Sequence, residues 1–341
     1  MNAVVVLALV IVLLLAAGLA YTIHRNRQLA DQLLRSNPDP NYLPLRRISP
    51  KMLQRPRTCI QYSEEINQLV QKAEPYLDPL KESCMHALKG GKRIRAIILC
   101  EIARATAKRY QNPFADPADA ALAVEFLHCA STAVDDLPEF DNDDLRRGEK
   151  ALWKTTSRGT ALMSSIVLVS ASFAFVRRQV QAMKIARCKD PEVLGMKMVE
   201  IVSRGLSVAA GGQDLDQQGS AQLLPAHVLQ AIRDKTGPFF AIAFCMGWCV
   251  GGGSSKQLEK MWKLGMCLGL AFQAADDIGD EQEDAQNGRC NLAVSHGTQE
   301  ARLIMDANLQ ECMDGLKAYG IKTRLWNEIT AMVLKKTLVV D

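Results

Sequence analysis

The sequence lacks the cysteine patterns that mark several common classes of protein. It contains ten cysteines, but no two stand in a CxxC arrangement and none has a zinc-like spacing with the five histidines. Most of the cysteines lie within apolar runs, where a free cysteine packs as a small hydrophobic residue. These absences argue against a structural zinc site and against a disulfide framework. They favour a reduced domain that faces the cytosol.

The sequence also lacks a strong net charge, an internal repeat of fixed period and any convincing run of alternating strand residues. A formal net charge of +4 over 341 residues is too small to make nucleic acid the main partner. From Ile60 almost to the end, apolar residues recur at the three-to-four spacing of helices. We therefore expect an all-α fold, a single helical bundle with its site in the core. The expected helices cover residues 60–75, 83–109, 117–137, 160–183, 191–210, 225–250, 255–284, 298–318 and 322–338.

The N-terminal segment, residues 1–23, has no charged side chain and consists almost wholly of Val, Leu, Ala and Ile. This is about the length that crosses a bilayer core. A cleaved signal peptide is the alternative, but the segment has no positive charge at its start and its apolar part is too long. Basic residues follow from His24 onward, which predicts a single-pass transmembrane anchor with the rest of the chain in the cytosol. Residues 24–57 are basic and proline-rich and are expected to be a linker, and residues 58–341 the helical domain.

Two apolar segments in the chain each end in a pair of aspartates. The first, residues 121–148, reads ALAVEFLHCASTAVDDLPEFDNDDLRRG, and the second, residues 268–280, reads LGLAFQAADDIGD. Burying paired carboxylates costs several kcal/mol unless a cation compensates them. A solvated acidic helix end is the alternative for either segment alone. Two such ends with basic residues nearby predict a cage for Mg²⁺ and a diphosphate, because Mg²⁺ takes one or two carboxylates and completes its shell with substrate phosphates.

These segments resemble known motifs. VDDLPEFDNDDLRRG and FQAADDIGD are similar to the first and second aspartate-rich motifs of the trans-polyprenyl diphosphate synthases, the geranylgeranyl and farnesyl diphosphate synthase family. GGKRIRA, residues 90–96, resembles the family's isopentenyl-diphosphate-binding motif, and the three motifs occur in the family's order between roughly Ser83 and Gly297. The resemblance implies an isoprenoid synthase-type bundle with a central cavity. It also implies an enzyme that joins isopentenyl diphosphate to an allylic diphosphate (dimethylallyl, geranyl or farnesyl).

The resemblance implies about two or three Mg²⁺ ions, for which Mn²⁺ can substitute. It ranks Asp135, Asp141 and Asp276 first as direct ligands. A straight helix would place Asp141 about 240° around the axis from Asp135, so a break at Pro138 is needed to bring both to one metal cluster. The full expected metal set comprises the aspartates of both motifs: Asp135, Asp136, Asp141, Asp276, Asp277 and Asp280.

Basic and amide side chains complete the expected site. Lys92 and Arg95 share one helical face, and His128 precedes Asp135 by two turns and so faces the same side. Arginine forks suit phosphate oxygens. By resemblance, the residues that bind isopentenyl diphosphate are Lys92, Arg95, His128 and Arg147, and those on the allylic side are Arg146, Lys235 and Thr236, with Gln213 and Gln273 near the reacting carbons. The expected catalytic residues are Asp135, Asp136, Asp141, Asp276, Lys235 and Gln273. For each basic or amide group, a polar residue without a role is the alternative.

Product length is argued from side-chain size. The residues that precede Asp135, from Ala130 to Ala133, are small, whereas farnesyl-length members of the family have a bulky aromatic residue there. This implies room for a tail of about twenty carbons or more, as in geranylgeranyl diphosphate. The apolar run from Met163 to Phe175 is expected to line the far wall.

The chain departs from the family pattern in places. Ala96 replaces a proline, MSSIV (residues 163–167) replaces a Gly-Asp pair, and in NGRCNLA Arg289 replaces a diphosphate-binding lysine unless that contact is lost. With the N-terminal anchor, AFCMGWCVGGG and WNEI, these departures are most similar to the trans-prenyltransferases of large DNA viruses, of the African swine fever virus type. That resemblance implies the host endoplasmic reticulum membrane, and the family implies a homodimer.

Two other functions compete with this prediction. A class I terpene cyclase also ionises an allylic diphosphate, but it should carry an Asn/Ser/Glu triad in place of DDIGD and has no need of GGKRIR. A non-catalytic, membrane-tethered partner subunit of another prenyl synthase stays open because NGRCNLA is altered. The aspartates of both motifs are intact, so a linear trans-prenyltransferase is the predicted function.

Overall fold

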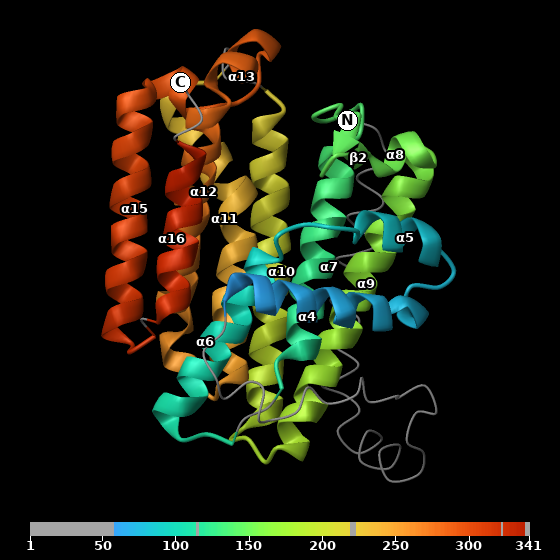
Figure 1. Cartoon of the computed structure of the whole chain (residues 1–341), viewed down its shortest axis with the longest axis vertical. Coiled ribbons are helices and arrows are strands. Elements are labelled where there is room, and N and C mark those ends of the chain that lie inside the picture. The colour runs from blue at the N-terminus through green and yellow to red at the C-terminus, as the bar shows by residue number, and fades with distance from the viewer. Residues whose placement is uncertain (1–57, 114–115, 219–222, 322, 338–341) are drawn as a thin grey trace.

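The computed structural model describes residues 58–113, 116–218, 223–321 and 323–337. They form a bundle that is almost wholly helical (Figure 1). The predicted anchor and linker lie outside the described residues. The helices are α4 (Cys59–Lys72), α5 (Lys81–Ala87), α6 (Ile94–Tyr110), α7 (Ala118–Asp135), α8 (Leu152–Thr155), α9 (Arg158–Ile185), α10 (Pro191–Asp216), α11 (Pro225–Val250), α12 (Leu258–Gly279), α13 (Glu281–Asn287), α14 (Leu292–His296), α15 (Thr298–Ala318) and α16 (Arg324–Lys336).

The predicted all-α bundle is confirmed, with two local differences. The helix expected over residues 83–109 is divided into α5 and α6. Gly90, Gly91 and Arg93 all have positive φ (68°, 91° and 55°), a conformation that a continuous helix cannot contain. A small antiparallel hairpin, β1 (Leu145–Arg146) paired with β2 (Glu149–Lys150), follows the first aspartate motif. Strands of this length leave no alternating pattern in a sequence.

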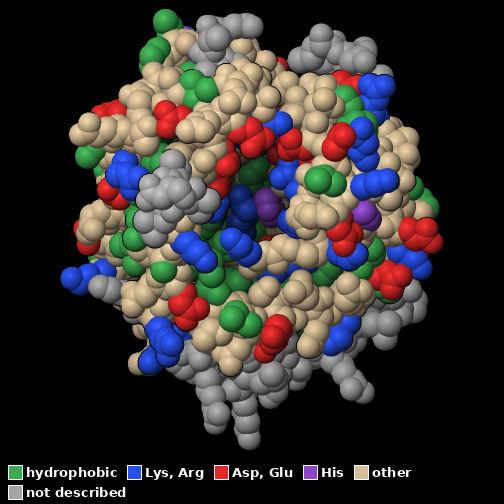
Figure 2. All heavy atoms as spheres, turned by 45° about the horizontal axis from the view of Figure 1, so that its top comes forward, with side chains coloured by type: hydrophobic (Ala, Val, Ile, Leu, Met, Phe, Trp, Pro, Cys, Tyr) green, Lys and Arg blue, Asp and Glu red, His purple; other side chains and the backbone are tan. Residues whose placement is uncertain are grey.

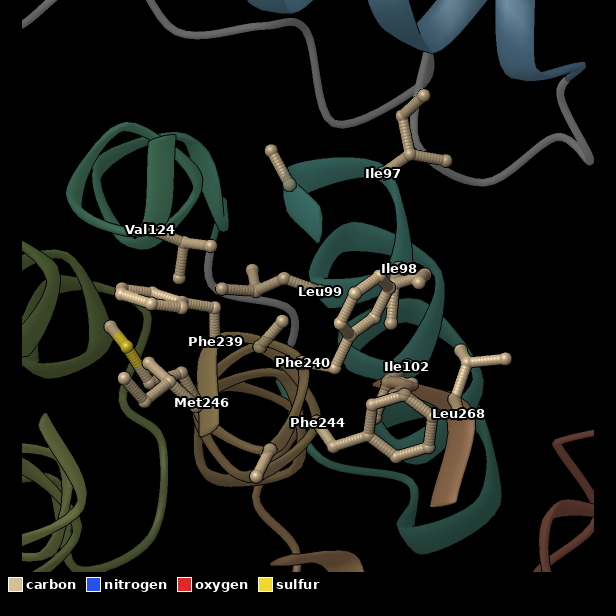
Figure 3. Packing of buried hydrophobic residues seen from close by; sticks show 14 of the residues in the cluster. Ile97, Ile98, Leu99, Ile102, Val124, Phe239, Phe240, Phe244, Met246 and Leu268 are labelled. Carbon is tan, nitrogen blue, oxygen red and sulfur yellow. The ribbon is translucent and has the colours of Figure 1, made fainter. Parts of the chain in front are cut away.

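Helix α11 is the centre of the bundle. Every residue from Gly237 to Val250 is buried, and the helix packs against α6, α7, α10 and α12. Figure 3 shows its aromatic side chains packed among Leu99 and Ile102 of α6, Val124 of α7 and Leu268 of α12. A helix that is apolar on all sides belongs in the interior. Lys235 and Thr236, the polar residues of α11 just before Gly237, are therefore held by a rigid and fully packed helix.

Helix α9 is the one helix among the described residues whose length and composition are sufficient to cross a membrane. It packs along α7 and also contacts α10, and 44% of its apolar window is buried within the bundle. Core helices of soluble proteins meet the same criteria of length and composition. We therefore treat α9 as part of the bundle.

A glycine sets the separation of α10 and α11. A Cβ atom built on Gly212 of α10 would lie 2.3 Å from the backbone carbon of Asp234 in α11, whereas nothing lies within 4 Å of one built on Gly211. Only a residue without a side chain fits at this crossing. The close approach brings the C-terminal end of α10 beside the polar turn of α11.

We expect Gly212→Ala to destabilise the protein by about 1–3 kcal/mol, because the added methyl group forces the two helices apart. Urea unfolding measures this free energy. Gly211→Ala is the matched control in the same helix and should be neutral or stabilising by about 0.5–1 kcal/mol, since its methyl group meets open space. Equal unfolding midpoints for the two variants would contradict the packing argument.

Candidate active site

A single large cavity of about 950 Å³ receives almost every site residue predicted from the sequence. Figure 2 shows it as a hollow, with acidic and basic side chains gathered around its mouth and a histidine in its depth. Of the predicted residues, those that line it are Lys92, Arg95, His128, Asp135, Asp141, Arg146, Arg147, Lys235, Thr236, Gln273, Asp276, Asp277 and Asp280. Asp136 and Gln213 are not among the lining residues.

The first acidic wall forms where α7 ends. The helix stops at Asp135, the chain turns through Pro138, and the backbone N–H of Asp141 donates a hydrogen bond to the carbonyl of Asp135 (2.9 Å). The break predicted at Pro138 is therefore present and brings the two aspartates together. Burial raises the pKa of Asp135 to about 7, with Asp141 raising it further while Lys235 opposes the shift. This wall carries closely spaced carboxylates that a cation would stabilise.

The second aspartate of each pair points into the protein. Asp136 is 2% exposed and accepts hydrogen bonds from Nε (2.7 Å) and Nη2 of Arg146. Asp277, also 2% exposed, accepts from the Gln273 amide (2.9 Å) and from the backbone N–H of Leu292 (2.8 Å). Both oxygens of Asp277 are thus engaged. Metal binding by Asp136 and Asp277 stays a prediction, and the contacts give each of them a positioning role.

Lys235 joins the first wall to α10. Its Nζ lies 2.7 Å from Oδ2 of Asp216 and 3.5 Å from Oδ2 of Asp141. Burial alone would lower the pKa of Lys235, but the carboxylates of Asp216, Asp135 and Asp141 raise it above its usual value, so the ammonium is charged. The sequence analysis missed Asp216, although it lies in the same GGQDLD segment as Gln213.

The neighbouring residue Thr236 is oriented by the second wall. Its hydroxyl donates to the Gln273 carbonyl oxygen (2.8 Å), and the Gln273 amide in turn donates to Asp277. These bonds fix the Gln273 amide, with its oxygen toward α11 and its nitrogen toward Asp277. Polar side chains of α11 and α12 are thereby held in one geometry at the cavity wall.

The glycine pair of GGKRIR accommodates an arginine. The Arg147 guanidinium donates from Nη1 to the carbonyls of Lys89 (3.0 Å) and Gly90 (3.1 Å). A Cβ atom built on Gly91 would lie 2.7 Å from Cζ of Arg147. The glycines therefore allow Arg147 to lie flat against this loop, a contact between two motifs that lie far apart in the sequence.

Arg95 and His128 form a buried pair deeper in the cavity. Nη1 of Arg95 lies 3.1 Å from Nε2 of His128, and the guanidinium sits 4.5 Å from the ring centroid of Phe240. Arginine can only donate, so Nε2 of His128 accepts and Nδ1 carries the proton. Burial, reinforced by Arg95, holds the pKa of His128 well below its usual value, so the ring is neutral. The buried Nε of Arg95 has no hydrogen-bond partner among the described residues, which leaves a donor for an anion.

Gln213 is buried in α10, and neither its amide oxygen nor its amide nitrogen has a hydrogen-bond partner within the described part of the chain. A buried amide without partners costs free energy, and such groups occur at functional sites more than elsewhere. Its position does not place it at the cavity surface. Its predicted role near the reacting carbons stays a prediction.

Two further cations reach the acidic walls, one from the altered NGRCNLA segment and one from a helix without a recognised motif. Nη2 of Arg289 lies 2.7 Å from Oδ1 of Asp143 and 2.9 Å from the carbonyl of Asp141, so the altered NGRCNLA segment still places a cation in the cavity. Lys336, in the last turn of α16, pairs with Oδ1 of Asp276. Sequence reasoning had no signal for Lys336, because it lies some 50 residues beyond the last motif.

The donor set fits Mg²⁺ that arrives with a diphosphate. No group of three or more His, Cys, Asp or Glu side chains among the described residues is arranged to hold a metal ion alone. Instead, Asp135 and Asp141 face the cavity from one side and Asp276 from the other, all of them carboxylates. Mg²⁺ is commonly bound in this way, by one or two carboxylates with substrate phosphates and water completing the shell.

A helical bundle with two acidic walls around one cavity defines the isoprenoid synthase class. The chain belongs to the polyprenyl synthetase family, whose sequence pattern matches residues 78–312. It is 38% identical over 291 residues to the trans-prenyltransferase of African swine fever virus (isolate Pig/Kenya/KEN-50/1950), covering 83% of this chain and 85% of that protein. This similarity confirms the predicted resemblance to the viral proteins.

More distant relatives agree with this assignment. The heterodimeric geranylgeranyl pyrophosphate synthase large subunit 2 of Arabidopsis thaliana is 33% identical over 238 residues, 66% of this chain and 58% of that protein. The structure of the Helicobacter pylori geranyltransferase, complexed with magnesium and isoprenyl diphosphate, has a TM-score of 0.60 and 22% identity and covers 81% of this chain and 97% of that one. At this identity the structural likeness supports the fold.

We expect Gly91→Ala to weaken binding of inorganic diphosphate several-fold, because the new methyl group displaces the Arg147 guanidinium. Isothermal titration calorimetry in the presence of Mg²⁺ measures this affinity. Gly297→Ala is the matched control, since Gly297 has a similar φ (87°, against 91° for Gly91) but open space around a Cβ. It should strain the backbone without changing affinity. A loss of equal size in both variants would show that backbone strain alone is responsible.

Proposed function

We propose that the protein is a trans-prenyltransferase that condenses isopentenyl diphosphate with an allylic diphosphate (dimethylallyl, geranyl or farnesyl). The product is a linear trans-polyprenyl diphosphate, of geranylgeranyl length or longer. The observation that carries this proposal is the placement of Asp135, Asp141 and Asp276 on the lining of one cavity that is also rich in basic side chains. The similarity to a viral trans-prenyltransferase and to a plant geranylgeranyl pyrophosphate synthase subunit supports it.

In the proposed reaction the allylic C–O bond ionises, the double bond of isopentenyl diphosphate attacks the carbocation, and a proton leaves. Bound Mg²⁺ supplies positive charge to the departing diphosphate. Lys235 and Arg146 lie at the first wall, and we assign them to the allylic diphosphate. Their positions are fixed by buried or half-buried carboxylates, so little reorganisation is needed as charge develops.

The second substrate has its own group of donors. Arg95, His128 and Arg147 lie on the side of the cavity formed by GGKRIR and α7. A neutral His128 donates from Nδ1 without adding charge, while Arg95 retains an unpaired donor. We assign these residues, with Lys92, to the diphosphate of isopentenyl diphosphate. Two diphosphates are thereby held apart, and their hydrocarbon ends meet over the apolar rings of Phe239 and Phe240.

The test is to incubate the full chain with Mg²⁺, isopentenyl diphosphate and farnesyl diphosphate and to identify the products by mass spectrometry. A chain-elongated linear diphosphate supports the proposal. A cyclic hydrocarbon would show a terpene cyclase instead. Absence of turnover, recovered only on addition of another prenyl synthase, would show a non-catalytic partner subunit.

Asp135→Ala and Asp276→Ala should each lower turnover by roughly two to four orders of magnitude, because the leaving diphosphate loses a metal contact. Steady-state kinetics with radiolabelled isopentenyl diphosphate measure the effect. Asp144→Ala is the control in the same acidic segment, since Asp144 is exposed, pairs with Lys154 and is not part of the cavity lining. Near-normal rates in either of the first two variants would count against the metal assignment.

We further propose that Ser131 and Thr132 set product length. Both line the large cavity, whereas Ala130 is buried in the core and Ala133 faces the smaller neighbouring cavity. The run from Met163 to Phe175, expected to form the far wall, contributes no lining residue to the large cavity. Small side chains at residues 131 and 132 leave room for a growing tail beside α7.

Ser131→Phe should therefore shorten the longest product by about one or two isoprene units, because a ring fills the space beside the tail. Chromatography of the dephosphorylated products measures chain length. Ser170→Phe, on an exposed turn of α9, is the control for an added ring and should leave the product unchanged. An unaltered distribution in the Ser131 variant would mean that the tail runs elsewhere.

We also propose that residues 1–23 anchor the protein, as a single-pass segment, in the host endoplasmic reticulum membrane with the enzyme facing the cytosol, and that the enzyme is a homodimer. Support for the anchor is the uncharged apolar composition of that segment and the basic residues that follow it. Carbonate extraction of microsomes tests the anchor, which is excluded if the protein is released. Sedimentation in detergent tests the homodimer, which is excluded by a monomer mass.

A further inference from the structure

Lys336 stands apart from the other cations of the site. It is the last residue of the C-terminal helix α16 and its Nζ pairs with Oδ1 of Asp276, an aspartate of the second wall. The same Nζ lies 5.1 Å from the ring centroid of Phe272, one turn earlier on α12. Both side chains are partly exposed at the cavity, 27% for Lys336 and 37% for Asp276. The ammonium thus lies on a carboxylate that faces the proposed metal position.

The end of α16 is held firmly against α12. Leu325, Trp326, Ile329 and Val333 are buried, and the Trp326 ring lies 5.8 Å from that of Phe244 in the central helix. At the last turn, the carbonyl oxygen of Lys336 would lie 3.2 Å from a Cβ on Gly279, which ends α12. The backbone at Lys336 is therefore fixed beside the second aspartate motif. The flexible four-carbon side chain is the part that can move.

The cations of the cavity differ in the carboxylate that holds each of them most closely, although Lys235 also reaches Asp141 at 3.5 Å and Arg146 and Arg289 share Asp143. Arg146 is bound to Asp136, which points inward, and Lys235 is held chiefly by Asp216 at 2.7 Å. Neither Asp136 nor Asp216 is among the aspartates ranked first as direct metal ligands. Lys336 pairs with Asp276, which is ranked first, and it has no second ion pair within the described part of the chain. A Mg²⁺ ion and an ammonium on the same carboxylate would repel one another at a few ångströms.

We propose that Lys336 competes with the metal for Asp276: its ammonium neutralises the second wall in the metal-free protein and leaves that carboxylate when Mg²⁺ binds. This inference rests on the proposed function, because it takes Asp276 as a metal ligand. Released from Asp276, the ammonium remains at the lining of the same cavity. Loading of the metal and the position of the Lys336 side chain are thereby coupled.

The test measures metal affinity without turnover. Mn²⁺ binding to the full chain in detergent, with a fixed amount of inorganic diphosphate and a protein-free diphosphate blank, is followed by loss of the free-ion electron paramagnetic resonance signal. Lys336→Gln should bind Mn²⁺ about three- to tenfold more tightly than the wild type, since a partly exposed ion pair no longer opposes the metal. Lys335→Gln removes the same charge from the adjacent exposed position and should change affinity less than about twofold. Lys336→Arg retains the pair and should resemble the wild type.

Unchanged or weaker Mn²⁺ binding in Lys336→Gln overturns the inference, because Lys336 would then support Asp276 rather than compete. If Mn²⁺ binding is unchanged or weaker but turnover is normal, the proposed function still stands. If the affinities are as expected but the chain makes no prenyl product, the proposed function is refuted and the inference about Lys336 is not.

Discussion

Repulsion among carboxylates is the constraint on which this structure depends. The end of α7 and the end of α12 bring Asp135, Asp141 and Asp276 to one cavity, where burial raises the pKa of Asp135 to about 7. Gathering these groups is unfavourable unless cations accompany them. Lys235, Arg146, Arg289 and Lys336 each pair with an acid of the two aspartate segments. Most charges of the site are therefore already paired with one another, and a metal–diphosphate complex would have to exchange partners with them.

The two aspartates of each pair have different roles, and the roles are the same in both pairs. In each pair the first carboxylate faces the cavity, while the second turns inward and fixes a neighbour: Asp136 holds Arg146, and Asp277 holds Gln273 and the backbone of Leu292. An inward carboxylate with satisfied hydrogen bonds is stable where a solitary one is not. Each Asp-Asp pair in the sequence thus combines one carboxylate that is available to a ligand with one that holds its neighbours in place. Both walls follow this rule although they lie on different helices.

The sequence was sufficient for the helices and for most of the cavity, because both leave local signals. Apolar periodicity located α7, α9, α11 and α12, and the motifs located the lining residues of the two walls. The division of residues 83–109 was missed, since it depends on the positive φ of Arg93 as well as on the glycines. Asp216 and Lys336 were missed because their partners lie 19 and 60 residues away in the chain. Contacts of this kind are fixed by packing, which a single sequence does not display.

The polarity of the helices explains why the acids stand at these ends. Asp135 closes α7 and Asp276 lies in the last turn of α12, where the negative end of each helix dipole already concentrates negative charge. A carboxylate is unfavourable at a helix C-terminus, so helix stability alone does not account for either position. The same geometry is favourable for a cation, which meets carboxylate and helix dipole together. Lys235 and Lys336 occupy this field, and a divalent ion such as Mg²⁺ would have twice their charge. A metal that arrives with the proposed diphosphate would therefore have an advantage over the protein's own cations at these two helix ends.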